Sequence, residues 1–176
     1  IYTSEWDQNA KNTYFANFGE MPFGDITSET TKAYIPKYFD VLCAGFPCQP
    51  FSKGGHRNGF EDTRGTLFFD ICEIIQKHQP KFLLLENVTN LVSHDGGNTY
   101  KVILRNLDNL GYVFPEEALI LSPDNFGVPT LRPRVYIPCV RKDIAEVDPE
   151  FIKNIKNHIK SYFSEEVDSK DSIINF

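Results

Sequence analysis

The stretch DVLCAGFPCQPFS at residues 40–52 constrains this chain more than any other. The apolar run at 41–44 predicts a short buried strand, and Gly45 then releases the backbone into a loop rich in proline. Cys48 lies in that loop, just beyond the strand end. Ligands bind at the carboxyl edge of open α/β sheets, so a thiol there is placed for chemistry. Cys43, inside the apolar run, is expected to be a small buried residue.

A cysteine in such a loop needs nearby positive charge before it can act as a nucleophile. The thiolate is the reactive form, and a free thiol has a pKa of about 8.5. Arg57 and Arg64 are close in the sequence, while Arg132 and Arg134 are distant candidates. The sequence leaves open which of them lies near Cys48.

Length and composition indicate about one globular domain, with 176 residues of which 41% are apolar and 24% charged. No run of about 18 apolar residues and no basic leader occurs, so we expect a soluble protein without a membrane span. The four cysteines lack metal-ligand or C-x-x-C spacing, so no metal site or disulfide framework is expected. A net charge of −6 argues against a broadly basic nucleic-acid clamp.

The N-terminal residues predict a strand at 1–4 followed by an acid, Glu5. An acid at the end of the second strand of a nucleotide-binding unit often binds ribose hydroxyls, and Trp6 could pack against a purine. On this stretch alone, a solvated acid and a core tryptophan explain the pair better. Asp7 is expected to cap a helix that ends before Gly19.

The next segments predict turns, a loop and a helix. Asp25 could accept a hydrogen bond from an exocyclic amine, although a simple turn is the better local explanation. The polar, glycine-rich residues 51–65 suggest a lid that closes on an anionic ligand. His56 in that loop is more simply a solvated side chain than a general base. An amphipathic helix is expected over 66–77.

Residues 81–86, KFLLLE, predict a second buried parallel strand with Glu86 at its end, one strand away from Cys48. A glutamate at the rim of an apolar strand can serve as a proton donor, and capping of the following turn explains it equally well. A helix is expected over 98–109, and edge strands of a mixed sheet over 112–121 and 134–140.

Two arginines precede the last strand. Arg132 and Arg134 are two residues apart, so on an extended segment they would share one face and suit a carbonyl or a carboxylate such as Glu86. A solvated basic edge is the alternative. Residues 147–163 predict a helix, and the polar remainder predicts a connector.

Together these stretches resemble the C5-cytosine DNA methyltransferase family, in the family's order and approximate spacing over residues 1 to about 142. The matching segments are GFPCQPFS (45–52), RGTLFFDI (64–71), ENV (86–88) and RPR (132–134), supported by SEWD (4–7) and GDIT (24–27). GFPCQPFS is highly specific and ENV is weak by itself, but the ordered set is strong.

The resemblance implies an α/β, Rossmann-like fold of the S-adenosylmethionine-dependent methyltransferases, a mixed sheet with helices on both faces that lacks the first strand. Residues 1–145 would form a partial catalytic domain. Residues 146–176 would be a helix and connector toward an absent target-recognition region.

The resemblance also implies a DNA (cytosine-5)-methyltransferase. The thiolate of Cys48 would add to C6 of a flipped-out cytosine, and C5 would then take the methyl group of S-adenosylmethionine. Glu86 would contact N3 and the exocyclic amine, Arg134 would bind O2, and Arg132 would support the site. The cofactor-binding residues implied are Glu5, Trp6, Asp25, Ile26, Pro47 and Leu67. The substrate-binding residues implied are Pro47, Gln49, Ser52, Asn87 and Val88.

The chain departs from the family pattern in three places. The glycine-rich loop after the first strand and the target-recognition region are missing, and Thr130 stands where the family usually has glutamine. We therefore expect a segment of a longer polypeptide that is incomplete in binding cofactor and DNA.

The implied setting is the bacterial cytoplasm, with nucleoid DNA and a restriction-modification system. The implied partners are double-stranded DNA and the remainder of the same chain, with no metal and no membrane. Three alternatives remain: a tRNA cytosine methyltransferase of the same family, a non-catalytic interaction module that keeps the fold, and, more distantly, a redox-thiol protein.

Overall fold

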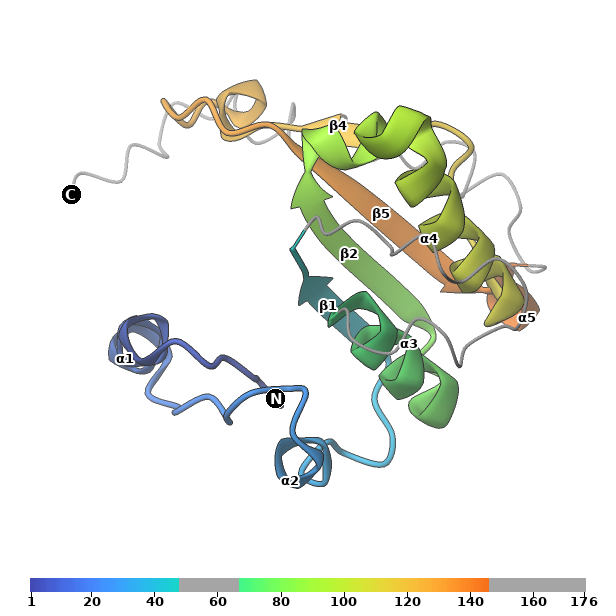
Figure 1. Ribbon diagram of the computed structural model, residues 1–176. Helices are drawn as coiled ribbons and strands as arrows, with labels where there is room; N and C mark the ends of the chain where they lie inside the picture. The colour runs from blue at the N-terminus through green and yellow to red at the C-terminus, as the bar shows by residue number, and fades with distance from the viewer. Residues whose placement is uncertain (48–66, 146–176) are drawn as a thin grey trace.

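The computed structural model describes residues 1–47 and 67–145, whose centre is a mixed five-stranded sheet (Figure 1). The strands are β1 (Val41–Gly45), β2 (Phe82–Val88), β3 (Tyr112–Val113), β4 (Leu119–Leu121) and β5 (Arg134–Arg141). Their order is β1-β2-β5-β3, and β4 also pairs with β5. β1 and β2 are parallel, whereas β5 is antiparallel to β2, β3 and β4. The predicted mixed sheet is confirmed, but the prediction of β5 as an edge strand is wrong, because it bonds strands on both sides.

The helices near 8–18, 67–78 and 98–109 follow the predicted positions closely, and two short helices were not predicted. They are α1 (Gln8–Phe18), α2 (Glu29–Lys32), α3 (Leu67–His78), α4 (Asn98–Asn109) and α5 (Lys142–Ala145), with short 3-10 turns at Thr89–Val92, His94–Gly97 and Pro123–Phe126. Asp7 caps α1 by accepting a hydrogen bond from the Ala10 N–H at 2.8 Å, and Gly19 ends the helix with a φ of 73°. The helix expected at 147–163 and the lid at 51–65 lie outside the described residues.

The hydrophobic core lies between the sheet and the two helices α3 and α4, which cover the same face (Figure 1). The side chains that build it are fully or almost fully buried. They include Phe68, Ile71, Cys72 and Ile75 of α3, Ile103 and Leu107 of α4, and Leu83, Leu85, Val135, Ile137 and Cys139 of the strands. Burial of each large apolar side chain contributes about 1.5–3 kcal/mol, so this face holds the domain together.

The opposite face of β1 and β2 is open in the described part of the chain. Strand side chains alternate between two faces, so Val41, Phe82 and Leu84 point away from α3 and α4 and are 54%, 38% and 39% exposed. Cys43 lies on this face and is also exposed. The prediction of a buried Cys43 is therefore wrong, and the second strand, predicted to be buried, is buried on one face only. A short apolar run does not reveal whether one face or both will be covered.

The N-terminal segment has less regular structure than predicted. In place of a strand at 1–4, it makes one isolated parallel bridge between Ser4 and Phe23. The Tyr2 hydroxyl also donates a hydrogen bond to the Thr31 carbonyl at 2.9 Å. Within the described part of the chain, no helix combines the length and the apolar character needed to cross a bilayer.

An ion-pair cluster around Lys32 joins this segment to the core. The ammonium of Lys32, which is 8% exposed, lies 3.0 Å from the Asp70 carboxylate and 2.6 Å from that of Glu73, both on α3. Glu29 contributes a third carboxylate at 3.3 Å. Burial alone lowers the pKa of Lys32, but its hydrogen bonds to Glu73 and Asp70 outweigh burial, so the pKa is raised above its ordinary value.

Replacing Lys32 should therefore destabilise the fold. In Lys32→Met the apolar stem keeps its packing but Asp70 and Glu73 lose their shared cation, so we expect a loss of about 1–3 kcal/mol in the free energy of unfolding. Urea denaturation measures it. Lys81→Met is the matched control, because its pair with Asp40 is 52% and 69% exposed and should contribute about 0–1 kcal/mol.

The pH dependence provides a second check on this cluster. A raised pKa in the folded state contributes stability that is fully present below the ordinary lysine pKa of 10.5 and is lost as pH rises beyond it. The difference between wild type and Lys32→Met should shrink above that pH. Equal losses of unfolding free energy in the Lys32 and Lys81 variants would contradict the proposal that the cluster around Lys32 stabilises the fold.

Candidate active site

A carboxylate and a guanidinium meet at the carboxyl end of β2. Glu86 is paired in register with Gly45 of β1 on one side and Tyr136 of β5 on the other. Its Oε1 lies 2.9 Å from Nε of Arg134, and their side chains are 37% and 21% exposed, respectively. The pair is thus partly open to a ligand. The predicted convergence of Glu86 with Arg134 is confirmed by this contact.

Gly45 leaves the space that the Glu86 carboxylate occupies. A Cβ placed on Gly45 would lie 3.1 Å from Oε2 of Glu86, closer than nine in ten real contacts of a Cβ. A larger residue would therefore push the carboxylate or the strand aside. The glycine that ends the apolar run in the sequence thus has a second role, beyond releasing the backbone.

Asn87 and Phe46 connect the two strand ends. The Nδ2 of Asn87 donates a hydrogen bond to the Phe46 carbonyl at 2.7 Å, and its Oδ1 accepts one from the Val88 N–H at 2.8 Å. Asn87 is 2% exposed, whereas Val88 is 39% exposed. Substrate contact by these two residues stays a prediction, although the Asn87 amide is already engaged within the protein.

Arg132 and Arg134 do not share a strand face as predicted. β5 begins at Arg134, and Arg132 precedes it in irregular backbone with its N–H donating to Oγ of Ser122 at 3.0 Å. The side chain of Arg132 is exposed, so its supporting role stays a prediction. Cys48, Gln49 and Ser52 lie outside the described residues, and their predicted roles stay predictions too.

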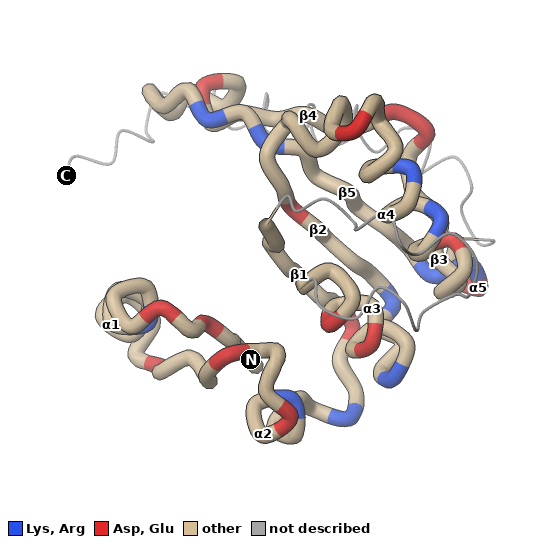
Figure 2. Tube along the Cα trace, viewed as in Figure 1, with Lys and Arg blue, Asp and Glu red and all other residues tan. Residues whose placement is uncertain are grey.

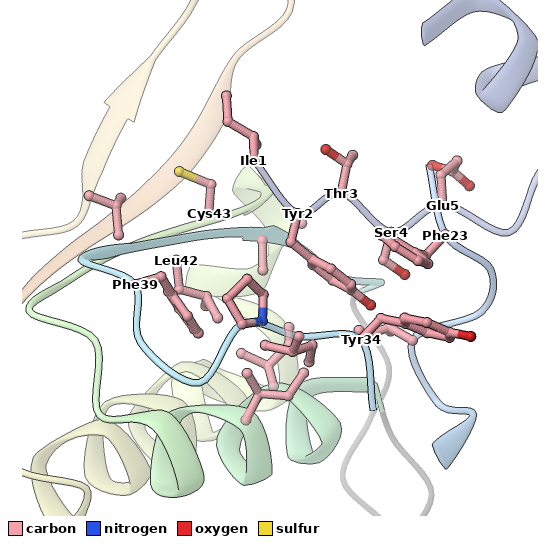
Figure 3. A pocket seen from close by; sticks show the side chains of 18 of the residues that line it. Ile1, Tyr2, Thr3, Ser4, Glu5, Phe23, Tyr34, Phe39, Leu42 and Cys43 are labelled. Carbon is pink, nitrogen blue, oxygen red and sulfur yellow. The ribbon is translucent and has the colours of Figure 1, made fainter. Parts of the chain in front are cut away.

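A pocket of about 1010 Å³ separates the N-terminal segment from β1 (Figure 3). One wall is residues 1–5, and the other is β1 with the start of α3. Figure 3 shows the sulfur of Cys43 on the side of Ile1, while Leu42 points the other way. In the described part of the chain, the β1 edge facing this pocket carries no partner strand.

The structure brings half of the predicted cofactor residues to this pocket. Glu5, Ile26 and Leu67 line it, whereas Trp6, Asp25 and Pro47 are not among its lining residues. Trp6 is 79% exposed rather than a core anchor. The carboxylate of Asp25 accepts hydrogen bonds from the backbone and the hydroxyl of Thr27, which lower its pKa, as the turn explanation predicts. Its predicted contact with adenine stays a prediction.

Sequence reasoning missed an aromatic row at the pocket wall. Tyr2 stacks on Phe23 with ring centroids 4.9 Å apart, and Phe23 stacks on Tyr34 at 5.0 Å. All three line the pocket. They are far apart in the chain, so no local pattern could have predicted that they stack. Flat aromatic faces of this kind suit a planar ring in a ligand.

No group of three or more metal-ligating side chains occurs among residues 1–47 and 67–145. The two core cysteines are also unsuited to chemistry. Burial raises the pKa of Cys72 to about 12, and that of Cys139 to about 12, so both stay protonated near neutral pH.

Comparison with known proteins points to one family. The family described as C-5 cytosine-specific DNA methylase matches residues 1–175. The chain is 61% identical over 138 residues to the type II methyltransferase M.HpaII of Haemophilus parainfluenzae, which covers 78% of this chain and 38% of that protein. It is 48% identical over 144 residues to M.HhaI of Haemophilus parahaemolyticus, and this match covers 82% of this chain and 43% of that protein. The chain thus spans about two fifths of the length of these curated relatives.

Solved structures show a similar fold. A putative DNA modification methyltransferase encoded within an E. coli prophage superposes with a TM-score of 0.59 at 22% identity, covering 82% of this chain and 41% of that one. A DNMT2 variant of Spodoptera frugiperda superposes with a TM-score of 0.57 at 21% identity, covering 81% of this chain and 42% of that one. At these identities the likeness supports the methyltransferase fold.

Thiol labelling should separate the cysteines by burial. At pH 8, iodoacetamide should modify Cys43 rapidly, because it is exposed on the open face of the sheet. Cys72 and Cys139, buried and with pKa values of about 12, should react at least about a hundredfold more slowly until denaturant is added. Peptide mass spectrometry resolves the four sites. Equal labelling of Cys43 and Cys72 in the native state would contradict the described packing.

Proposed function

The chain belongs to the C-5 cytosine-specific DNA methylase family, and on that basis we propose that it carries catalytic residues of a DNA (cytosine-5)-methyltransferase. One observation supports this most directly. Glu86 and Arg134 form an ion pair beside Gly45, where the chain leaves β1 toward Cys48. A carboxylate and a guanidinium from two strands thus meet at the sheet edge from which the sequence continues toward Cys48.

The proposed chemistry gives each of these groups a role. C5 of cytosine is a weak nucleophile, and addition of the Cys48 thiolate to C6 makes it enamine-like. Glu86 contacts N3 and the exocyclic amine, and Arg134 binds O2, so both stabilise the charge that builds in the ring. After methylation, loss of the C5 proton breaks the bond from C6 to sulfur and releases the thiolate. The base must first leave the duplex, at a cost of a few kcal/mol.

The pocket beside β1 fits part of a nucleoside cofactor. S-adenosylmethionine, when bound, supplies the methyl group. Glu5 is the carboxylate that would hold ribose hydroxyls, and Ile26 and Leu67 offer apolar contacts for adenine. The hydrogen bond that Glu5 accepts from the Asp7 N–H, at 2.8 Å, fixes its carboxylate near the pocket rim.

The charge distribution supports DNA contact that is local rather than broad. Figure 2 shows mainly acidic positions around α1, and residues 1–28 contain four acids against one lysine. Phosphate binding depends on clustered lysine and arginine, which this region lacks. We therefore propose that DNA binding, in the bacterial cytoplasm, depends on parts of the whole protein beyond this segment.

A chimera tests the proposed function. The 138 matched residues of this chain would replace their counterparts in M.HpaII, and labelled methyl transfer from S-adenosylmethionine to unmodified duplex DNA would be measured. The chimera should transfer methyl, whereas the 176-residue chain alone should show little transfer. In the chimera, Cys48→Ser should abolish the covalent adduct with 5-fluorocytosine DNA, and Glu86→Gln should slow transfer about a hundredfold or more.

Three outcomes would contradict parts of this proposal. Robust transfer by the chain alone would refute its incompleteness. Methylation of tRNA but not DNA would favour the tRNA alternative. A folded chimera whose adduct formation does not depend on Cys48 would favour a non-catalytic interaction module. Lys101→Ala is a suitable control, because Lys101 is an exposed residue of α4 that has no proposed role in the site.

A further inference from the structure

The hydrogen bond from Asn87 to Phe46 lies where the backbone pairing of two strands stops. The parallel ladder between β1 and β2 ends at the pair Gly45 and Glu86. One residue farther along each strand, a side-chain hydrogen bond replaces the backbone pairing: the Asn87 amide donates to the Phe46 carbonyl at 2.7 Å. A side-chain amide thus extends the pairing by one step, up to the point where the loop begins.

Asn87 is held firmly enough to act as an anchor. It is 2% exposed, and its Oδ1 accepts the N–H of Val88 at 2.8 Å, which fixes the orientation of the amide. A buried amide that loses its partner costs about 1–3 kcal/mol, so the hydrogen bond to Phe46 is strongly favoured over an open arrangement. The position of Asn87 is in turn set by β2, the strand that also carries Glu86.

Phe46 is fixed from its other end by packing. Its side chain is 8% exposed, and its ring lies 5.3 Å, centroid to centroid, from that of Phe68 on α3. The residue two positions before Cys48 is therefore held by its carbonyl and by its ring. Gly45, before it, leaves room for the Glu86 carboxylate, because a Cβ there would lie 3.1 Å from Oε2.

We propose that Asn87 is a positioning residue that fixes where the Cys48 loop leaves β1 relative to Glu86. This rests on the proposed function, in which both residues act on one cytosine ring. Since Asn87 follows Glu86 directly on β2, one strand end places the carboxylate and, through Phe46, the start of the loop. The amide of Asn87 serves this geometry through its hydrogen bonds to Phe46 and Val88.

Disulfide formation measures this placement without DNA or cofactor. The parent chain for this assay carries Cys43→Ser and Glu86→Cys, so that thiols stand at positions 48 and 86. In a glutathione redox buffer these two thiols reach equilibrium with the disulfide that joins them. Each disulfide formed consumes one glutathione disulfide and yields two glutathione thiols. The equilibrium gives the effective concentration of one thiol at the other. Adding Asn87→Ala to the parent chain should lower this effective concentration at least about tenfold.

Matched variants separate the hydrogen bond from general stability. Asn106→Ala also removes an amide bonded to a backbone carbonyl, that of Val102 at 2.8 Å, but within α4, and should leave the effective concentration unchanged. Asn87→Asp keeps the shape but loses the donor when ionised, and should behave like Asn87→Ala. Circular dichroism checks folding.

Several results would overturn the proposal. These are an unchanged effective concentration in Asn87→Ala, no disulfide in the parent chain, or loss of fold in both Asn87 variants, which would make Asn87 a support of the whole sheet. The assay is independent of catalysis. An inactive chimera with a normal Asn87 effect would refute the proposed function alone, and the reverse result would refute only the positioning role.

Discussion

The hydrogen bonding of β2 to a parallel neighbour on one side and an antiparallel neighbour on the other determines the site. Parallel pairing with β1 places Gly45 beside Glu86, and antiparallel pairing with β5 brings Arg134 back to the same end of the sheet. Glu86 pairs with Gly45, whereas Arg134 pairs with Val88, two residues farther along β2 and on the same face as Glu86, so the Arg134 side chain reaches the Glu86 carboxylate diagonally. A shift of one residue in either register would turn Glu86 to the opposite face from Gly45 or Arg134.

The two main ion-pair sites of the described chain differ in exposure, and this difference fits their roles. Lys32 is buried among carboxylates, where it joins the N-terminal segment to α3. Glu86 and Arg134 are more exposed, so a polar ligand can reach both groups with a smaller desolvation cost. The first arrangement suits structure, and the second suits recognition.

The exposed surfaces beside β1 can be compared with the share of the relatives that this chain spans. The chain spans 38% of M.HpaII and 43% of M.HhaI. In the described residues, β1 has an edge without a partner strand, and apolar side chains remain exposed on one face of the sheet. Exposed strand edges and apolar faces of this kind are normally covered in stable proteins. The contact between Glu86 and Arg134 is nevertheless formed, because it depends only on β2 and β5.

Much of the fold followed from local sequence patterns. The cap at Asp7, the stop at Gly19 and the apolar spacing of α4 depend on neighbours within a few residues, so these elements could be predicted. The motif around Cys48, together with Glu86 and Arg134, also indicated the family and its chemistry. The exposure of Cys43 could not be predicted, because a run of apolar residues does not say which face will be covered.

Contacts between distant segments were decided only by the tertiary structure. The order of the strands, the central place of β5 and the stacking of Tyr2 on Phe23 all join residues with no local relation. The same holds for the bond from Asn87 to Phe46, which spans 41 positions. The sequence by itself determined which chemical groups the chain carries and in what order. Strand pairing decided which of them meet, since hydrogen-bond register is a property of two segments together.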